Sequence, residues 1–516
     1  MEILKNIIEY LAIAMSGVFL VYKTNNILMF YQQAHYHFSS FKRIIKHYYF
    51  GKLQYFIFGI LAFVMFLDLW YIAIIYILYI VFLLVIFFKR KGIIKLKQTA
   101  RIYRNYITLL LIGTIISSTI LLLVDLPELN SSLALIIFFL PFLVFLSSAI
   151  IYPIELLISK YYQCKSRRKL AKINPTTIGI TGSFGKTTTK NILFEFLKDK
   201  YITLKTRKSF NTLNGLSISI NEDLTKEVEV FIAEMGASRV GDISDLVNLV
   251  PLNYAILTGI TSQHLESFKT VQNIINEKVK IIEALDENGI GIVNGDDKFL
   301  NSIHFDVKAK LIKFGFSSTN DYYATDIKLN KTEMSFTINY ENKKILVKTN
   351  LIGRHNVLNI LASFALAKEL GVSDLELVEK IKTLEAPKNR LKIEKLGTHV
   401  IIDDSFNSNN VGFVNALEVL SLYSRPRILI TPGIVEGGSL EAEMNYELAS
   451  EIVKVVDEVV LIETKASMHI LEGLKSLGFE KVVVLDKFVD AKKYVFEKYP
   501  KGTILIENDV SDIYKI

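Results

Sequence analysis

The chain has 516 residues, enough for about three domains, a net charge of +8 and a single cysteine, Cys164. One cysteine excludes an intrachain disulfide and a zinc cluster built from cysteines. Hydrophobic residues make up 51% of the chain, and their excess lies almost wholly before residue 160. The basic residues gather between apolar runs, which favours membrane topology over nucleic-acid binding as the explanation of the charge.

Apolar runs suited to crossing a bilayer occupy the first third of the chain. They are Ile7–Tyr22, Leu53–Leu67, Leu69–Phe88, Tyr106–Val124 and Leu133–Ile158. The first run lacks a basic leader and a cleavage site, so an uncleaved anchor is expected, with an interfacial helix as the alternative. The sequence therefore predicts about five transmembrane helices in a region covering residues 1–165.

The charges of the connecting segments predict the orientation of these helices. The segment after the third run carries seven basic residues and no acid: Lys89, Arg90, Lys91, Lys95, Lys97, Arg101 and Arg104. The segment between the fourth and fifth runs carries Asp125 and Glu128 and no base. By the positive-inside rule, the N-terminus lies outside and everything after the fifth run lies in the cytoplasm.

The clearest local motif covers Ile178 to Thr189 and has the layout of a phosphate-binding loop. An apolar run, Thr176 to Thr181, enters a loop with Gly182 and Gly185, and Lys186-Thr187 opens a helical pattern over Thr188 to Leu197. Such a loop presents backbone N–H groups, a lysine and a hydroxyl to phosphates and Mg²⁺. The usual spacing requires one more glycine, at Ile180, so an ordinary strand–turn–helix stays open at this point.

From Asn174 onward, short β-rich runs alternate with helical patterns. The predicted strands are Val228–Met235, Tyr254–Ile260, Gly289–Asn294, Val400–Asp403, Arg427–Thr431, Glu458–Ile462, Lys481–Leu485 and Thr503–Ile506. This alternation predicts two α/β units with parallel sheets, with a boundary at Pro387 to Arg390. Ligands in such folds lie at the carboxyl ends of the strands.

Several polar residues follow these predicted strands. Glu234 ends one strand, His264 follows the next, and Lys278 lies on the helical stretch Val271–Leu285. A strand-end carboxylate can face a nucleotide-bound Mg²⁺, and histidine is a common ligand. Each residue taken alone has an ordinary alternative: a cap, a structural histidine or a solvated lysine.

Taken in order, these pieces resemble the Mur ligases, the ATP-dependent amide ligases of peptidoglycan assembly, and most closely the members that add D-alanyl-D-alanine. The match runs from about residue 176 to 435 and includes the glycine-poor phosphate loop. Its other motifs are Asn211-Thr212-Leu213-Asn214-Gly215, Glu234-Met235-Gly236-Ala237, His264-Leu265-Glu266, Lys278, Asn294-Gly295-Asp296-Asp297, Gly353 to Asn359, Arg390-Leu391 and Asp403 to Asn407.

The resemblance implies a central ATP-binding domain with a parallel sheet at 170–387 and a Rossmann-like domain at 388–516. It implies that Gly182, Ser183, Phe184, Gly185, Lys186, Thr187, Thr188, Asn359, Arg390 and Asp404 bind ATP. Thr187 and Glu234 would hold one Mg²⁺, and His264 and Lys278 a second, with Lys278 as a carbamate. Lys186, Lys278 and His264 would be catalytic, and Asn211 would position the acceptor. The apolar runs, taken together with this resemblance, predict a multi-pass protein of the bacterial cell membrane with its catalytic domains in the cytoplasm.

Two departures leave the substrates open. The family normally begins with a soluble domain for the UDP part of its substrate, and the apolar region stands in its place, which favours an acceptor held in the membrane. The last predicted strand leads to the acidic turn Glu507 to Asp512, where the adding ligases carry a basic one. A γ-glutamyl polymer ligase or another amino-acid ligase acting on a membrane-held acceptor is therefore the alternative. A transport ATPase of the ABC type would need a Leu-Ser-Gly-Gly-Gln-like signature, which does not occur in this sequence. A catalytically silent scaffold would not need Lys186, Glu234, His264, Lys278 and Asp404 together.

Overall fold

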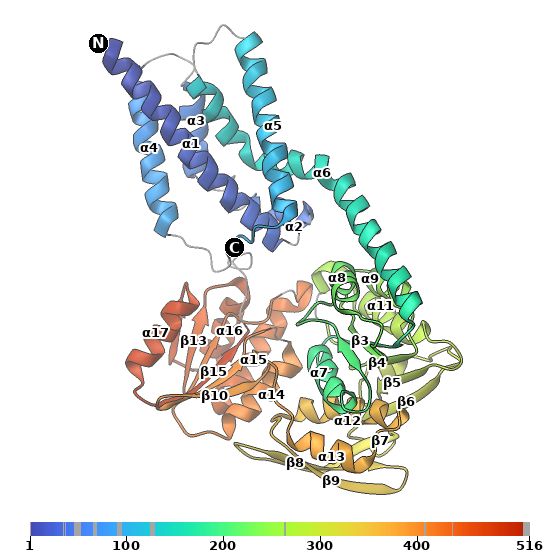
Figure 1. Cartoon of the computed structure of the whole chain (residues 1–516). Helices are drawn as coiled ribbons and strands as arrows, with labels where there is room; N and C mark the ends of the chain where they lie inside the picture. Colours follow the sequence, from blue (N-terminus) through green and yellow to red (C-terminus); the bar gives the residue numbers. More distant parts are fainter. Residues whose placement is uncertain are drawn as a thin grey trace. The chain divides into compact units, whose positions relative to one another are not determined.

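The structure is a computed structural model that describes residues 2–34, 36, 38–45, 53–64, 70–89, 95–123, 129–262, 265–406, 409–435 and 437–508. The chain divides into two compact units, Met1–Ser159 with Ser511–Ile516, and Lys160–Val510. Over the described residues the first unit is helical and the second is α/β (Figure 1).

The first unit consists of helices that follow the predicted apolar runs. They are α1 (Glu2–Gln33), α2 (Phe38–Ile45), α3 (Leu53–Val64), α4 (Trp70–Lys89), α5 (Ala100–Leu123) and α6 (Leu129–Ile173), whose last part belongs to the second unit. Among the described residues, Glu2–Gln33 and Ser132–Ile173 are long and apolar enough to cross a membrane, whereas the apolar parts of α3 and α4 are shorter. The sequence also predicts a tight hairpin around Asp68 between the second and third apolar runs, and this segment lies outside the described residues. Multi-pass insertion stays a prediction.

Polar contacts join α5 to α6 within the helical unit. Arg104 Nε lies 2.6 Å from Glu155 Oε1, and Asn105 Oδ1 accepts hydrogen bonds from Ser147 Oγ and Ser148 Oγ at 3.2 and 3.1 Å. In apolar surroundings such bonds have few competitors, so they favour one helix pairing over others.

The second unit contains a nine-stranded sheet in the order β2-β3-β1-β4-β5-β6-β7-β8-β9. Its strands are β1 (Thr176–Thr181), β2 (Thr203–Lys205), β3 (Val230–Glu234), β4 (Tyr254–Leu257), β5 (Ile290–Asn294), β6 (Lys310–Gly315), β7 (Tyr322–Leu329), β8 (Met334–Tyr340) and β9 (Lys343–Thr349). The pairs from β2 to β7 are parallel, and β7, β8 and β9 pair antiparallel.

Helices cover both faces of this sheet. They are α7 (Lys186–Leu197), α8 (Leu213–Asp223), α9 (Asp242–Leu249), α10 (Leu265–Phe268), α11 (Val271–Glu283), α12 (Arg354–Glu369) and α13 (Asp374–Lys382), with a 3₁₀ turn at Leu300–Ser302. Along β3, Ile232 packs in the core with α7 and α12, and its neighbours Phe231 and Ala233 pack in the core with α8, α9 and α11. Because successive side chains point to opposite faces, a strand buried on both faces is apolar at nearly every position.

A second sheet follows, in the order β10-β11-β15-β12-β13-β14. Its strands are β10 (Lys392–Leu396), β11 (His399–Asp404), β12 (Arg427–Thr431), β13 (Glu458–Ile462), β14 (Val482–Leu485) and β15 (Gly502–Glu507). Its helices are α14 (Asn410–Ser421), α15 (Glu441–Val455), α16 (Lys465–Ser476) and α17 (Phe488–Lys498), with a 3₁₀ turn at Gly438–Leu440. All pairs are parallel except β10 with β11.

The predicted strands all occur, most within two residues of the expected ends. The strand expected to reach Ile260 ends at Leu257, and the helix expected from Thr188 begins at Lys186. Strands β2, β6, β7, β8, β9 and β10 were not predicted from the sequence. The domain boundaries at 165, 170 and 387 stay predictions.

Candidate active site

The phosphate loop joins β1 to α7, and its two glycines are required by close contacts. Gly182 has φ +151° and Gly185 has φ +76°. A Cβ atom on Gly182 would lie 1.9 Å from Thr258 Oγ1, and one on Gly185 would lie 2.3 Å from Asn359 Oδ1. Gly185 caps α7 without a side-chain hydrogen bond, so the first N–H groups of this helix remain available to an anion.

The other residues of the loop fix it to the segment after β4. Ser183 N donates to Gly259 O at 2.8 Å, and Thr261 N donates to Ser183 Oγ at 2.9 Å. Thr258 Oγ1 donates to Phe184 O, and Thr188 is buried. The loop is therefore held in one conformation by contacts with the segment that follows β4.

Two lysines from different helices converge on one carbonyl of this loop. Lys186 Nζ donates to Gly182 O at 2.6 Å, and Lys278 Nζ, from α11, donates to the same oxygen at 3.1 Å. Burial lowers the pKa of Lys186 to about 8. Burial, with the charge of Lys186, lowers the pKa of Lys278 well below its usual range. Two buried lysine side chains at one glycine loop fit the phosphates of a nucleotide, whose negative charge would favour their protonated forms.

The carboxylate of Glu234, at the carboxyl end of β3, forms a second polar centre beside this loop. Its Oε1 accepts hydrogen bonds from Thr187 Oγ1 at 3.1 Å and from Asn211 Nδ2 at 3.2 Å. Its Oε2 lies 2.9 Å from Lys190 Nζ, and both side chains of this ion pair are 1% exposed. The register Ile180↔Glu234 between β1 and β3 brings the carboxylate to the phosphate loop.

These oxygen donors fit one Mg²⁺, because a hydroxyl and a carboxylate are the ligands that this hard cation prefers. The second predicted metal position is less complete. His264 lies outside the described residues, and among the described residues no group of three or more His, Cys, Asp or Glu gathers as a metal site.

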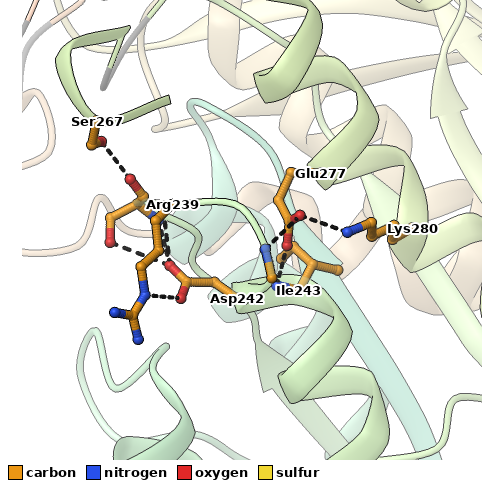
Figure 2. A network of polar contacts seen from close by, with 8 residues as sticks. Arg239, Asp242, Ile243, Ser267, Glu277 and Lys280 are labelled. Atoms are coloured by element: carbon orange, nitrogen blue, oxygen red, sulfur yellow. Dashed lines mark hydrogen bonds and ion pairs between the residues drawn. The ribbon is translucent and has the colours of Figure 1, made fainter. Parts of the chain in front are cut away.

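A polar network fixes the N-terminal end of α9 against α11, the helix that carries Lys278 (Figure 2). Glu277, which is 1% exposed, accepts hydrogen bonds from Gly241 N at 2.9 Å and Ile243 N at 2.6 Å, and pairs with Lys280 Nζ at 2.8 Å. Asp242 Oδ2 accepts from Arg239 N at 3.0 Å. Because Glu277 precedes Lys278, this network limits how far the Lys278 backbone can move.

We expect Glu277→Gln to loosen this anchor. One charge-assisted acceptor of two backbone N–H groups is weakened, which should cost about 1.5–3 kcal/mol. Hydrogen exchange of the Gly241 and Ile243 amides should become faster. Glu283→Gln, an exposed position on the same helix, is the matched control, and equal exchange in both variants would contradict the role given to Glu277.

Arg390 lies just before β10, and Asp404 is the last residue of β11 in the second sheet. Burial lowers the pKa of Arg390, whose guanidinium lies 4.1 Å from the Phe406 ring centroid. Burial raises the pKa of Asp404 to about 6, against the opposite effect of Arg390. The charge of Arg390 also acts on Lys186, so the two regions lie within electrostatic range.

Asn359, on α12, is buried against the glycine loop. Its Oδ1 accepts from Thr189 Oγ1 at 3.2 Å, and its Nδ2 donates to Asn356 Oδ1 at 3.1 Å. His355, one residue before Asn356, was not predicted from the sequence. Burial, together with Arg390, lowers the pKa of His355 to about 4, so the imidazole is neutral near pH 7.

Most of the predicted site residues that the structure describes therefore gather at one edge of the nine-stranded sheet. Lys190 was missed as well, although it follows Lys186 by four residues on a helix and so shares its face. The role of each residue stays a prediction.

Comparisons with known proteins agree with this geometry. Residues 180–367 match the family model described as the Mur ligase middle domain. The UDP-N-acetylmuramoyl-tripeptide–D-alanyl-D-alanine ligase of Bacillus subtilis (strain 168) is 27% identical over 342 residues, which are 65% of this chain and 73% of that protein. The corresponding ligase of Escherichia coli (strain K12) is 29% identical over 304 residues, 58% of this chain and 67% of that protein. The MurF ligase of Thermotoga maritima in complex with ADP superposes with a TM-score of 0.62 at 26% identity, and covers 69% of this chain and 81% of that one.

The phosphate loop, its two lysines and these similarities define an ATP-dependent ligase that forms carbon–nitrogen bonds. Residues 180–367 match the Mur ligase middle domain, and the parallel-sheet α/β fold of the second unit is similar to that of solved Mur ligases.

Proposed function

We propose that this chain is a membrane-anchored ligase of peptidoglycan assembly, which joins a carboxylate of a cell-wall precursor to the amine of D-alanyl-D-alanine or a related amino acid or dipeptide. The observation that carries the proposal is the pair of buried lysines, Lys186 and Lys278, on the carbonyl of Gly182 beside the Glu234 carboxylate. The similarity to D-alanyl-D-alanine ligases supports the choice of substrates.

In this proposal the nucleotide lies across the glycine loop. Lys186 and the backbone N–H groups of the loop bind the phosphates, with Arg390 as a further phosphate contact. Asn359 contacts the adenine and Asp404 the ribose. Asn211, whose amide donates to Glu234, positions the acceptor.

A carboxylate is a poor acyl donor because its leaving group would be oxide, so it must be activated before an amine can attack it. A carboxylate oxygen of the acceptor attacks the γ-phosphorus of ATP, the bond to the β,γ-bridging oxygen breaks, and ADP leaves. The amine then attacks the carbonyl carbon of the acyl phosphate, inorganic phosphate leaves, and the nitrogen loses a proton to give the amide. Lys186 stabilises the negative charge on the transferring group, since a fixed cation in a buried site needs no reorganisation.

Thr187 and Glu234 would hold one Mg²⁺, and His264 with Lys278 a second. When bound, these ions would neutralise charge on the phosphates. An ammonium group cannot ligate a cation, so the second position requires a modified Lys278. We propose a carbamate there, which replaces a cation that faces Lys186 with an anionic oxygen donor.

The carbamate gives a specific prediction. We expect turnover to fall when bicarbonate and CO₂ are removed from the buffer, and to return when bicarbonate is added. A carbamate carbon signal in NMR of protein treated with ¹³C-bicarbonate should be present in the unmodified chain and absent from Lys278→Arg. Turnover that is independent of bicarbonate, with no such signal, would contradict the carbamate.

The membrane placement is supported by the helical unit. Large apolar side chains there are exposed, among them Leu110 (71%), Leu122 (84%) and Leu157 (68%). Side chains of this kind are normally covered, and a bilayer would cover them. We therefore propose several membrane passes, with the catalytic part in the cytoplasm and an acceptor that is itself held in the membrane.

Mass spectrometry of the reaction products tests the function. Purified full-length protein would receive ATP, Mg²⁺, bicarbonate and D-alanyl-D-alanine, with UDP-MurNAc-tripeptide or its lipid-linked form as acceptor. We expect the pentapeptide product, with a preference for the lipid-linked acceptor, and no product from Lys186→Ala. Equal turnover of the two acceptors would contradict the proposal that the acceptor is held in the membrane. ATP binding without either product would direct the search to glutamyl acceptors.

A further inference from the structure

The last part of α6, residues 160–173, has two faces of different chemistry. Its sequence carries six basic residues and no acid: Lys160, Lys165, Arg167, Arg168, Lys169 and Lys172. Arg167 and Lys169 donate hydrogen bonds to α8 and α9, whereas the other four form no ion pair with the residues that the structure describes. The division follows from the positions of these residues around the helix.

One face is fixed to α8 and α9. Ser166 Oγ donates to Ser217 O at 3.2 Å, and Lys169 Nζ donates to Asn221 O at 2.8 Å, near the C-terminal end of α8. Arg167 Nη2 donates to Asn248 O at 2.6 Å, near the C-terminal end of α9. Cations at helix C-termini also interact favourably with the helix dipole. Leu170, buried among Leu216 and Ile220, completes the contact.

The other face carries the remaining cations. Lys160, Lys165, Arg168 and Lys172 are exposed, and none of the four forms an ion pair with any residue that the structure describes. At 3.6 residues per turn, the four fall within about 140° of the helix circumference and extend over roughly 18 Å of its length. Tyr161, which is 65% exposed, and Cys164 lie on the same face.

We propose that this face, defined by Lys160, Lys165, Arg168 and Lys172, binds the headgroups of anionic phospholipids. The inference rests on the membrane placement proposed above. The face continues directly from the apolar part of α6, so its first cation lies at the boundary of the bilayer and the next within reach of the headgroups. Clusters of four or more basic residues next to a membrane-spanning helix attract anionic lipid, and an exposed tyrosine suits the interface.

The arrangement has a consequence for the catalytic part. Because the opposite face of the same helix is bound to α8 and α9, an attraction between the cationic face and the bilayer is transmitted to the α/β unit without a flexible linker. The attraction holds the catalytic part near the leaflet in which a membrane-held acceptor lies. Salt should weaken this effect, since the cations are exposed.

Cys164 provides the test, because it is the single cysteine of the chain and lies on the face itself. The full-length protein, with a spin label on Cys164, would be placed in nanodiscs of phosphatidylcholine alone or with added phosphatidylglycerol. We expect the label to become less mobile and less accessible to a water-soluble relaxation agent in the anionic discs. High salt should reverse both changes.

Variants distinguish lipid binding by the proposed face from a general effect of the protein's positive charge. Lys160→Gln/Lys165→Gln/Arg168→Gln should remove the difference between the two lipids, whereas exchange of the lysines for arginine should preserve it. The control, Lys481→Gln/Lys492→Gln/Lys493→Gln, removes the same charge from exposed positions just before β14 and on α17, and should behave as the unmodified chain.

A label that is insensitive to phosphatidylglycerol, or an equal loss in the control, would overturn the proposal, as would failure of the chain to enter nanodiscs. None of these readings depends on turnover. Failure of the ligase assay therefore leaves this result intact, and the two proposals can fail separately.

Discussion

Lys186→Ala is expected to reduce ATP-dependent product formation by about a thousandfold or more, because this change removes the ammonium group nearest to the transferring phosphate. Lys186 is the first residue of α7, and its Nζ is held at Gly182 O. Lys278 remains near the Gly182 carbonyl, but as the proposed carbamate it carries a negative charge and cannot replace the Lys186 ammonium group. The loss should fall on kcat more than on ATP affinity, since charge accumulates on the phosphate in the transition state.

Steady-state kinetics and calorimetric ATP binding would measure these two effects separately. Lys198→Ala is the matched control, because Lys198 lies at the other end of α7, is exposed and forms an ion pair with Glu195, away from the glycine loop. Lys186→Arg keeps the charge but changes the geometry, and we expect it to remain strongly impaired. Turnover of Lys186→Ala within a few-fold of the unmodified chain would exclude the proposed role of the loop.

The parallel strands could be predicted from the sequence because they are buried on both faces. Such strands read as short continuous apolar runs, as β3, β12 and β13 do. The antiparallel extension gives a weaker signal. In β9 (Lys343–Thr349) only Val347 and Thr349 are buried, and lysines occupy most other positions. In β10 (Lys392–Leu396) no residue is fully buried. Edge strands of this kind are specified by their pairing partner more than by their own residues.

The candidate site was partly predictable for a similar reason. Parallel strands end at a common edge, so Glu234 and the loop after β1 had to lie close together once the sheet was predicted. The partners of Glu234 were not predictable in this way. The Lys190–Glu234 contact depends on the distance between a helix and a strand, and the bonds of Glu277 depend on how α11 lies against α9. Tertiary packing decides both, and no local pattern encodes it.

The ion pair between Lys190 and Glu234 gives the second prediction. Both side chains are 1% exposed, and Lys190 Nζ also donates to Lys208 O. Removing one partner of a buried pair leaves an uncompensated charge, so Lys190→Met and Glu234→Gln should each cost about 3–5 kcal/mol of the free energy of unfolding. The double variant should cost much less than the sum of the two, because both charges leave together.

Activity should follow a different order from stability. Lys190→Met keeps the proposed Mg²⁺ ligand, and a bound cation would replace the lost positive charge, so Mg²⁺ with ATP should stabilise this variant more than the unmodified chain. Glu234→Gln and the double variant should lose turnover even where the double variant recovers stability. Loss of a metal ligand is not repaired by restoring charge balance.

Denaturant or thermal unfolding in detergent, with and without Mg²⁺ and ATP, would measure the four states of this cycle. Lys310→Met/Glu369→Gln is the control pair, since Lys310 is 59% exposed and an exposed pair should contribute about 1 kcal/mol or less. Additive losses from the two single variants would mean that Lys190 does not compensate Glu234. Full turnover in the double variant would show that Glu234 is not a metal ligand and that the pair is a structural contact between α7 and β3.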